Sequence, residues 1–406
     1  MTPFAQVCAE LDRRRQITLG FERIEALLSA MGHPERDVPG LVQVVGTNGK
    51  GTTAMALAAA LREMGYPSGA YLSPHVLSYT ERVVLRGSQV SEEDFATAMG
   101  ETIDLADREG IPVSQFEILT AGALGMFAAA GLKWAVLEAG LGARHDATSV
   151  VGPDAVVLTN VSVDHNEYLG ETVEEIAEEK LASLTPDATL FLGTDDERII
   201  DLAHSACRRL GARLVMPGEV GENTPFPGLA PYAAGDVRLG LAVAESLLER
   251  KLPAEIKDRI ALDVWEALPG RFEVHEVNDV AVVVDGGHNA AGLSAALSGM
   301  RAAYGDRLLG VVFGVLREKD AVSMLAELKR EADLIVLTRP ENERAADPAQ
   351  VEHGLLDRGE KSALVVENPV EALGVAVEAV REAAGVVLVT GSLSPAAPVL
   401  RWLREA

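Results

Sequence analysis

Residues 45–53 read Val45-Gly46-Thr47-Asn48-Gly49-Lys50-Gly51-Thr52-Thr53 and lie between a short apolar run, Leu41 to Val45, and an alanine-rich segment, Ala54 to Met64. A glycine-rich turn between a strand and a helix is typical of phosphate binding. Small residues let backbone N–H groups approach phosphate oxygens, and the start of the helix adds partial positive charge. Lys50 adds a full positive charge, and Thr52 or Thr53 offers a hydroxyl to Mg²⁺. The stretch predicts a nucleoside triphosphate enzyme.

The run departs from the strict P-loop pattern. That pattern places a glycine where Val44 stands and a serine or threonine directly after the lysine, where this chain has Gly51. On this stretch alone, an ordinary glycine-rich turn between strand and helix therefore remains an alternative. The rest of the chain favours the phosphate-binding loop.

Length and composition set the next limits. A chain of 406 residues is too long for one hydrophobic core, so we expect two domains. The hydrophobic content of 48% suffices for both, and an aromatic content of 4% predicts aliphatic cores. The net charge of -25 argues against nucleic acid, which needs a basic face. An anionic substrate must therefore be attracted by local Lys and Arg or by metal ions.

The two cysteines, Cys8 and Cys207, are far apart and form neither a disulfide framework nor a metal-ligand pattern. We interpret both as reduced packing residues. No charged and then apolar leader opens the sequence, and no apolar run approaches the roughly 18 residues that a membrane helix needs. These observations predict a cytoplasmic protein without a membrane partner.

Short β-branched runs recur, and helical patterns follow them. A first series comprises Val42 to Val45, Trp134 to Leu137, Ala155 to Leu158 and Thr189 to Leu192. A second comprises Val280 to Val284, Leu308 to Phe313, Leu334 to Leu337, Ala363 to Val366 and Val386 to Val389. They predict an α/β protein with a P-loop NTPase-like, mainly parallel sheet domain and then a smaller Rossmann-like α/β domain. The turn-forming Pro269-Gly270-Arg271 separates the series, so we expect domains at residues 1–270 and 271–406.

Ligands bind at the carboxyl ends of the strands in open parallel sheets, so polar residues after the runs are candidate site residues. They are Lys50, Glu138, Asp164, His165, Asp285 and His288. Glu138 could be a hard oxygen ligand for Mg²⁺, but a strand-end carboxylate on its own more often caps a neighbouring helix. A lone histidine such as His165 is more typical of a structural residue.

The helix predicted from Val173 to Leu184 opens with a capping box of Thr172 and Glu175. Lys180 lies on this helix among four glutamates. The residues alone favour a solvated helix face whose ion pairs each contribute a few tenths of a kcal/mol.

The second domain offers two further candidates. Asp285 follows a predicted strand, in Val284-Asp285-Gly286-Gly287-His288-Asn289, and could accept hydrogen bonds from a ribose hydroxyl. Arg271, at the domain junction, could bring a positive charge to a phosphate. Either residue could equally make a structural contact between domains.

Taken in order, these segments resemble the folylpolyglutamate synthase/dihydrofolate synthase family, a branch of the Mur ligase superfamily. The segments that carry the resemblance are Gly46 to Thr52, Ser73-Pro74-His75 with Glu81-Arg82, Phe116-Glu117, Glu138 to Thr148, Asp164-His165, Glu179-Lys180, Pro269-Gly270-Arg271, Asp285 to Asn289 and Thr390-Gly391-Ser392. Each motif is weak alone, whereas the ordered set is specific. The glycine between Lys50 and Thr52 also favours the folate branch over the cell-wall branch.

The resemblance implies roles that the residues alone do not give. It implies two Mg²⁺ ions and a carbamate on Lys180, which would turn a cation into an anion near metal. It implies catalytic roles for Lys50, Lys180 and His165, with metal ligands Ser73, Glu138 and His165 beside Thr52. It places ATP on Asn48, Gly49, Lys50, Gly51, Thr52, Arg271, Asp285 and His288. It places the pterin-bearing substrate on Arg82, Ser114, Gln115, Phe116, Glu117, His145, Asp146 and Ala147.

The sequence departs from the family's usual pattern at several positions. Gly142-Ala143-Arg144-His145 stands where members commonly have Gly-Gly-Arg-Leu, and Ser149 replaces an Asn. Leu181-Ala182 replaces Ala-Gly, Gly287 replaces Ala, and Ala290 replaces Pro. The family's ATP-contacting Asn is replaced near Asp236. These changes bear on pterin specificity and adenine contacts and leave the ligase chemistry unchanged.

The implied activity is ATP-dependent amide formation. A phosphoryl group converts a carboxylate to an acyl phosphate, and the amine of L-glutamate displaces phosphate; the acceptor is dihydropteroate, a reduced folate or both. Two alternatives are a ligase that extends a UDP-linked muramoyl peptide and a P-loop nucleotide switch without catalysis. The first needs a UDP-binding domain, and the stretch before Gly46 is too short to form one. We further expect a monomer.

Overall fold

The computed structural model describes residues 1–164, 166–216, 226, 228–356 and 363–405. The chain divides into two compact units. Unit 1 comprises Met1–Phe226 and Gly235–Val264, and unit 2 comprises Pro227–Ala234 and Trp265–Ala406. Among the described residues, none of the helices has the length and apolar character needed to cross a membrane. The domain boundary at residues 270 and 271 stays a prediction.

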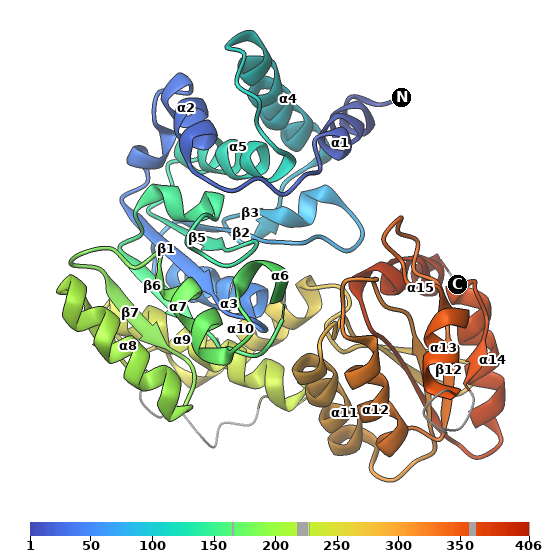
Figure 1. Ribbon diagram of the computed structural model, residues 1–406. Coiled ribbons are helices and arrows are strands. Elements are labelled where there is room, and N and C mark those ends of the chain that lie inside the picture. Colours follow the sequence, from blue (N-terminus) through green and yellow to red (C-terminus); the bar gives the residue numbers. More distant parts are fainter. Residues whose placement is uncertain (165, 217–225, 227, 357–362, 406) are drawn as a thin grey trace. The chain divides into compact units, whose positions relative to one another are not determined.

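The core of unit 1 is an eight-stranded sheet in the order β4-β3-β2-β5-β1-β6-β7-β8 (Figure 1). Its strands are β1 (Gly40–Val45), β2 (Ser68–Tyr71), β3 (Val83–Leu85), β4 (Ser88–Gln89), β5 (Trp134–Glu138), β6 (Ala155–Leu158), β7 (Thr189–Leu192) and β8 (Arg213–Val215). In this spatial order, the neighbouring strands β2, β5, β1, β6, β7 and β8 are all parallel to one another. Strands β3 and β4 extend the sheet beyond β2 in antiparallel pairs.

The register of the central strands brings the candidate site residues to one edge. Val44 of β1 is opposite Glu138 of β5, and Val45 is opposite Leu158 of β6. These strands are parallel, so the segments that follow them leave the sheet at the same edge. Residues 46–50, 139–146 and 159–164 are therefore neighbours although they are distant in sequence.

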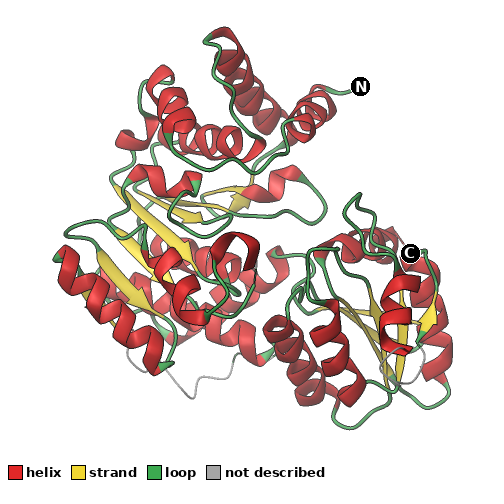
Figure 2. Cartoon of the chain, in the orientation of Figure 1, coloured by secondary structure: helices red, strands yellow, loops and turns green. Residues whose placement is uncertain are grey.

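Helices flank this sheet (Figure 2). They are α1 (Pro3–Arg13), α2 (Glu22–Ala30), α3 (Lys50–Glu63), α4 (Glu92–Arg108), α5 (Gln115–Ala129), α6 (Asn166–Leu169), α7 (Val173–Leu181), α8 (Glu197–Leu210), α9 (Pro231–Leu247) and α10 (Ala254–Ala267), with 3₁₀ helices η1 (Pro34–Asp37), η2 (Tyr79–Arg82) and η3 (Ala147–Val151). Helix α3 packs on β1, β2 and β5. Helix α7 packs on α8, which covers β7 and β8.

Unit 2 contains a six-stranded sheet in the order β13-β12-β11-β14-β10-β9. The strands are β9 (Glu273–Val277), β10 (Val280–Val284), β11 (Leu309–Phe313), β12 (Leu334–Leu337), β13 (Leu364–Val365) and β14 (Val386–Thr390), and all pairs except β9 with β10 are parallel. The helices of this unit are α11 (Ala290–Tyr304), α12 (Ala321–Glu331), α13 (Pro348–Leu356), α14 (Pro369–Arg381) and α15 (Leu393–Glu405).

Alternation along β11 explains the two layers of helices in unit 2. Val311 joins a core cluster with Leu297 of α11 and Leu325 of α12. Gly310 points to the other face, where a Cβ atom would lie 3.1 Å from Val380 of α14. Helices on both faces of a mainly parallel sheet confirm the predicted α/β fold class.

Candidate active site

The turn after β1 has the geometry of an anion cradle. Helix α3 begins at Lys50, before the predicted start at Ala54, and Gly49 is its N-cap with φ 80°. Gly51 and Thr52 therefore lie in the first helical turn, where N–H groups lack partners within the helix, whereas the Thr53 N–H already donates to the Gly49 carbonyl at 3.0 Å. The Thr53 hydroxyl donates to the Asp236 carbonyl at 3.2 Å, so Thr52 is the better candidate for a metal-facing hydroxyl.

The segment after β6 holds this turn in place. Asn160 Oδ1 accepts from the Asn48 N–H at 3.0 Å, and its Nδ2 donates to the Asn48 carbonyl at 2.9 Å. The Thr159 hydroxyl donates to the same carbonyl at 2.7 Å. Thr47 exchanges two hydrogen bonds with the Ser162 backbone. Sequence reasoning assigned no role to Thr159 and Asn160, although their position at a polar strand end was the available signal.

Two lysines converge on the same turn. Lys50 Nζ donates to the Thr47 carbonyl at 3.1 Å, and Lys180 Nζ donates to the Gly46 carbonyl at 2.9 Å. Lys180 is 3% exposed, so the prediction of a solvated helix face is wrong. Burial, followed by the nearby charge of Lys50, lowers the pKa of Lys180 to about 7. A substantial fraction of this amine is therefore neutral near pH 7.

Glu138 ends β5 as a buried carboxylate beside the start of α3. Its Oε2 accepts from the Ser73 N–H at 2.8 Å. A Cβ atom at Gly51 would lie 3.2 Å from the same oxygen, so the glycine keeps the space beside the carboxylate open. An anionic oxygen next to an open space suits a hard cation, so the residues fit the implied Mg²⁺.

The described residues contain no group of three or more His, Cys, Asp or Glu side chains that could hold a metal ion. The predicted metal and catalytic residue His165 lies outside the described part of the chain. Asp164, directly before it, is buried, and its charge acts on Lys180.

Asp146 organises the loop after β5. Oδ2 accepts from the N–H groups of Gly140 and Leu141, each at 2.9 Å, and Oδ1 accepts from the N–H and hydroxyl of Thr148 at 3.0 and 2.5 Å. Burial raises the pKa of this carboxyl. Because four donors bond to this one carboxylate, Asp146 stabilises the conformation of the loop.

The other predicted pterin-site residues surround this loop. Ser114 and Glu117 form the capping box of α5, and Glu117 also accepts from Arg23 Nε at 3.1 Å. The Phe116 ring packs against Gly140: a Cβ atom at this glycine would lie only 2.6 Å from the ring. His145 is exposed, with its ring centroid 6.3 Å from that of Phe21. The remaining predicted residues of this group have buried positions: Gln115 in the first turn of α5 and Ala147 at the start of η3.

Arg82, the last predicted substrate residue, ends η2 and is buried. Its Nε donates to His75 Nδ1 at 2.8 Å. Burial, followed by the charges of Arg82 and Arg15, lowers the pKa of His75 to about 3.

Unit 2 holds the three remaining predicted nucleotide residues. Asp285 is buried at the end of β10, where it accepts from the Tyr232 hydroxyl, the Phe272 N–H at 3.0 Å and the Gly287 N–H at 2.8 Å. Burial raises the pKa of Asp285, and Arg271 opposes that shift. His288 Nδ1 lies 3.1 Å from the Gly286 carbonyl.

Comparison with known proteins bears on this site. Residues 44–212 match the Mur ligase middle domain, and residues 270–393 match the Mur ligase glutamate ligase domain. A dihydrofolate synthase/folylpolyglutamate synthase of Escherichia coli is 33% identical over 336 residues, which are 79% of this chain and 77% of that protein.

The chain belongs to the folylpolyglutamate synthase/dihydrofolate synthase family.

Solved structures of the family have the same fold. A folylpolyglutamate synthase of Mycobacterium tuberculosis complexed with ADP has a TM-score of 0.88 at 27% identity, with 99% of this chain and 98% of that chain covered. A bifunctional enzyme with Mn, AMPPNP and L-glutamate bound has a TM-score of 0.84 at 30% identity, with 100% and 98% covered. The family consists of ATP-dependent ligases, which confirms the predicted family and enzyme class.

Two departures from the family's usual pattern are packed close to the loops. Asp236 on α9 faces the phosphate loop, because a Cβ atom at Gly49 would lie 2.2 Å from its Oδ1. Ala143, where members commonly have Gly, is fully buried and joins a core cluster with Ala177 and Leu181 of α7. The exposed His145 follows it. Within the loop after β5, His145 is thus an exposed residue between the buried Ala143 and the buried Asp146.

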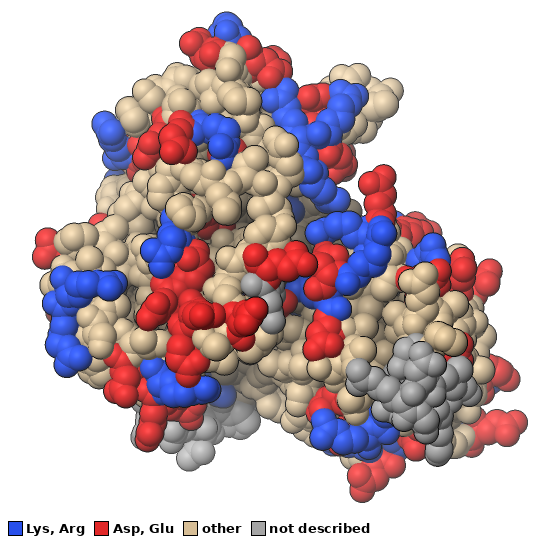
Figure 3. All heavy atoms as spheres, viewed as in Figure 1, with Lys and Arg blue, Asp and Glu red and all other residues tan. Residues whose placement is uncertain are grey.

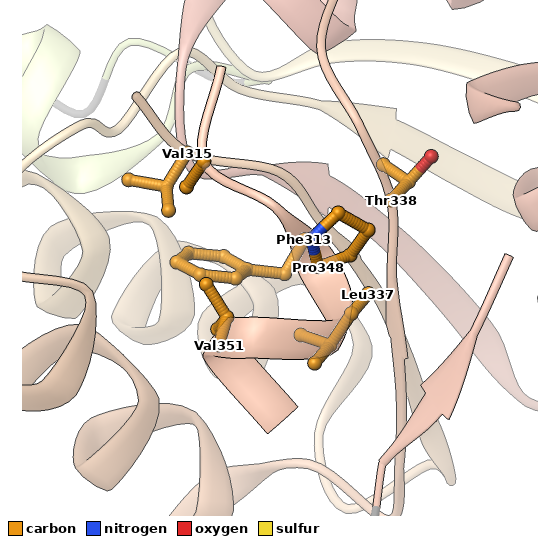
Figure 4. Close-up of a pocket in the computed structure, with 7 residues that line it drawn as sticks. Phe313, Val315, Leu337, Thr338, Pro348 and Val351 are labelled. Carbon is orange, nitrogen blue, oxygen red and sulfur yellow. The ribbon is translucent and has the colours of Figure 1, made fainter. Parts of the chain in front are cut away.

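A hollow in unit 2 lies at the carboxyl ends of β11 and β12 (Figure 4). Its unfilled space is about 170 Å³, part of which is open solvent. Phe313, Val315, Leu337 and Val351 give it an apolar lining, with Thr338 at one side. The lining contains no charged group, so this hollow is unsuited to a nucleotide or an amino acid.

Proposed function

We propose that this chain joins L-glutamate to the carboxylate of dihydropteroate, to a reduced folate, or to both, with ATP as the phosphoryl donor. One observation carries the proposal: the phosphate loop, two lysines and the Glu138 carboxylate meet at one edge of the unit 1 sheet. Support comes from the relatives, which are named for these reactions, and from the solved family structure with AMPPNP and L-glutamate bound.

The reaction needs activation because a carboxylate does not react with an amine. The acceptor carboxylate takes the γ-phosphoryl group of ATP, which gives an acyl phosphate and ADP. The neutral amine of L-glutamate then attacks the acyl carbon, the amide bond forms, and inorganic phosphate leaves with the former carboxylate oxygen. The scheme requires no side-chain nucleophile. Lys50 and the N–H groups of the first turn of α3 hold and neutralise the phosphates, so positioning supplies most of the acceleration.

The residues that would hold divalent metal in unit 1 are Thr52, Ser73 and Glu138, together with His165. When bound, Mg²⁺ neutralises charge on the transferring phosphoryl group. The two-ion count is part of this proposal and follows from the family resemblance. The bound Mn in the solved relative supports a divalent cation in general.

Lys180 is proposed to carry a carbamate. A neutral amine attacks CO₂, forms an N–C bond and releases one proton, which leaves an anion on the side chain. The buried position and the pKa of about 7 make that neutral amine available. We expect Lys180→Ala to reduce the rate steeply, whereas bicarbonate should raise the activity of wild-type enzyme prepared without CO₂. Mass data that show a bare amine in fully active enzyme, with full activity in Lys180→Ala, would contradict the carbamate.

The ligand contacts are assigned as follows. ATP is expected on residues 48–52, Arg271, Asp285 and His288, and the pterin on residues 114–117 and 145–147. Three observations favour this pterin site: Phe116 is only partly buried, His145 is exposed and both border the loop after β5. A cytoplasmic location and a monomeric state also remain predictions.

The decisive experiment offers the purified chain ATP, Mg²⁺ and L-glutamate with dihydropteroate or tetrahydrofolate in separate reactions. Product masses should show addition of glutamate to one acceptor or to both, with ADP release that depends on acceptor and glutamate. Reactions without L-glutamate are the control. Nucleotide binding without amide formation would favour a nucleotide switch, and activity on a UDP-muramoyl peptide alone would favour a cell-wall ligase.

A further inference from the structure

Gln43 is a polar side chain in the middle of the unit 1 sheet. It lies on β1, between β5 and β6, and is 0% exposed. Its two neighbours on the same face of the strand, Leu41 and Val45, each belong to an apolar core cluster. Figure 3 shows charged side chains spread over the viewed surface, where water can surround them. The amide of Gln43 has no such contact with water, so its hydrogen bonds have to come from the protein.

Both amide protons of Gln43 go to hydroxyl groups of η3. Nε2 donates to Thr148 Oγ1 and to Ser149 Oγ, each at 2.8 Å. The carbonyl oxygen Oε1 is buried, and within the described residues it has no hydrogen-bond partner. A buried acceptor without a donor lowers the stability of a fold. An apolar side chain would avoid this loss, so the two donors are what the amide contributes here.

The two hydroxyls connect Gln43 to the loop after β5. The Thr148 hydroxyl donates to Asp146 Oδ1 at 2.5 Å, and the Ser149 hydroxyl donates to the Ala143 carbonyl at 2.6 Å. A hydroxyl has one proton, so each of these groups can only accept from Gln43. The direction of both paths is therefore fixed, from the amide through a hydroxyl to an acceptor in the loop.

The loop that receives these bonds adjoins the proposed reaction site. It begins directly after Glu138, the proposed metal ligand, and Asp146 Oδ2 accepts from the Gly140 and Leu141 N–H groups, each at 2.9 Å. Asp146 is therefore bonded to the first part of the loop through one oxygen and to the path from Gln43 through the other. The hydrogen bonds of one buried side chain thus extend from the sheet to the start of the loop.

We propose that Gln43 is a positioning residue for the acceptor substrate. Its two donors hold η3 on β1 and thereby fix the loop with His145 and Asp146, two of the residues proposed to bind the pterin. The inference rests on the proposed function, since it concerns the acceptor of that reaction. Gln43 makes no contact with a substrate itself, because it is fully buried. One of the two paths uses Ser149, where this chain departs from the asparagine common in the family.

The test replaces Gln43 by methionine, which has a similar volume and no donor. In Gln43→Met the Thr148 and Ser149 hydroxyls keep their own acceptors and the buried Oε1 is gone, so the midpoint of thermal unfolding should stay close to wild type. We expect the KM for the acceptor that the wild type uses, dihydropteroate or tetrahydrofolate, to rise about tenfold, because the loop loses two hydrogen bonds. The KM for ATP should stay within about twofold of wild type. The exposed Gln89→Met is the matched control.

A second substitution tests the path itself. Ser149→Ala removes one of the two hydroxyls and should raise the same KM about threefold in the wild-type background. In Gln43→Met the donor to this hydroxyl is already absent, so Ser149→Ala should have a smaller effect there. Equal effects in both backgrounds would show that Ser149 acts independently of Gln43, which contradicts the inference.

The remaining outcomes are distinct. An unchanged acceptor KM in Gln43→Met would overturn the inference. A parallel rise in the KM values for acceptor, ATP and L-glutamate, together with a lower unfolding midpoint, would also overturn it, since that pattern indicates a packing residue. If Gln43→Met does not fold, Ser149→Ala decides: a rise confined to the acceptor KM supports the inference, and an unchanged KM refutes it. Wild-type chain that adds glutamate to neither acceptor would count against the proposed function instead.

Discussion

The turn after β1 in unit 1 and the turn after β10 in unit 2 are built alike but carry opposite charges. Each joins a buried parallel strand to a helix through glycines, Gly46 and Gly49 in the first and Gly286 and Gly287 in the second. In the first turn, the amines of Lys50 and Lys180 donate hydrogen bonds to backbone carbonyls. The second has the buried Asp285, which three donors surround.

The difference shows how one piece of backbone geometry serves two kinds of ligand. Free N–H groups at a helix start attract an anion when cations stand beside them. A carboxylate that accepts from the turn's own N–H group repels phosphate and suits neutral hydroxyl groups. The first turn is therefore suited to phosphate groups, and the second is suited to neutral hydroxyl groups.

We expect the largest effect from a substitution in the first turn, the turn after β1. Lys50→Ala should lower ligation by on the order of a thousandfold, because the positive charge proposed to neutralise the phosphates disappears from a half-buried, preorganised turn. Product formation measures the loss, and thermal unfolding should stay close to wild type. The exposed Lys133→Ala is the control. An unchanged turnover number in the Lys50 variant would remove this loop from catalysis.

Glu138→Gln tests the carboxylate beside the same turn. A neutral amide is a poorer ligand for a hard cation, so Mg²⁺ dependence and rate should weaken together, by about ten- to a hundredfold. A titration of activity with Mg²⁺ measures both. The exposed Glu101→Gln should behave as wild type. A wild-type titration in the Glu138 variant would exclude this side chain from the metal site.

Asp285→Asn addresses the second turn. The amide nitrogen cannot accept a hydrogen bond, so at least one of the Tyr232, Phe272 and Gly287 donors loses its partner. We expect ADP affinity to fall about tenfold. Calorimetric titration with ADP measures it, and the exposed Asp279→Asn is the matched control. An affinity equal to wild type would show that the negative charge is dispensable for the nucleotide.

The last test concerns stability and pH. The pKa of Lys180 is about 7 in the fold and 10.5 ordinarily, so between these values the unfolded chain binds more protons than the folded chain. The free energy of unfolding should rise with pH in this window relative to Lys180→Met, by at most about 1.4 kcal/mol per pH unit. Denaturant unfolding in CO₂-free buffer measures it. A constant difference between the proteins from pH 7 to pH 10 would refute a depressed pKa.

Sequence patterns predicted the buried strands well, because β6 and β10 are continuous apolar runs between turn residues, β5 is apolar up to Glu138, and β1 is interrupted only by Gln43. The patterns missed β2, β3, β4, β8 and β9, which are short or alternate in polarity. Lys180 shows why local reasoning fails at a site. Its neighbours in sequence are glutamates, whereas in the fold its amine donates to the Gly46 carbonyl. Only the ordered family motifs indicated that Lys180 belongs to the site, and they did not indicate this contact.

Helix α7 links the loop after β5 to the loop after β1 through consecutive residues. Glu179 accepts from the Arg144 N–H at 3.1 Å in the loop after β5, and Lys180 donates to Gly46 in the loop after β1. Helix α7 therefore fixes the positions of both loops. A sequence change that tilts α7 displaces both loops at once, so substitutions on this helix that reshape one loop are constrained by their effect on the other.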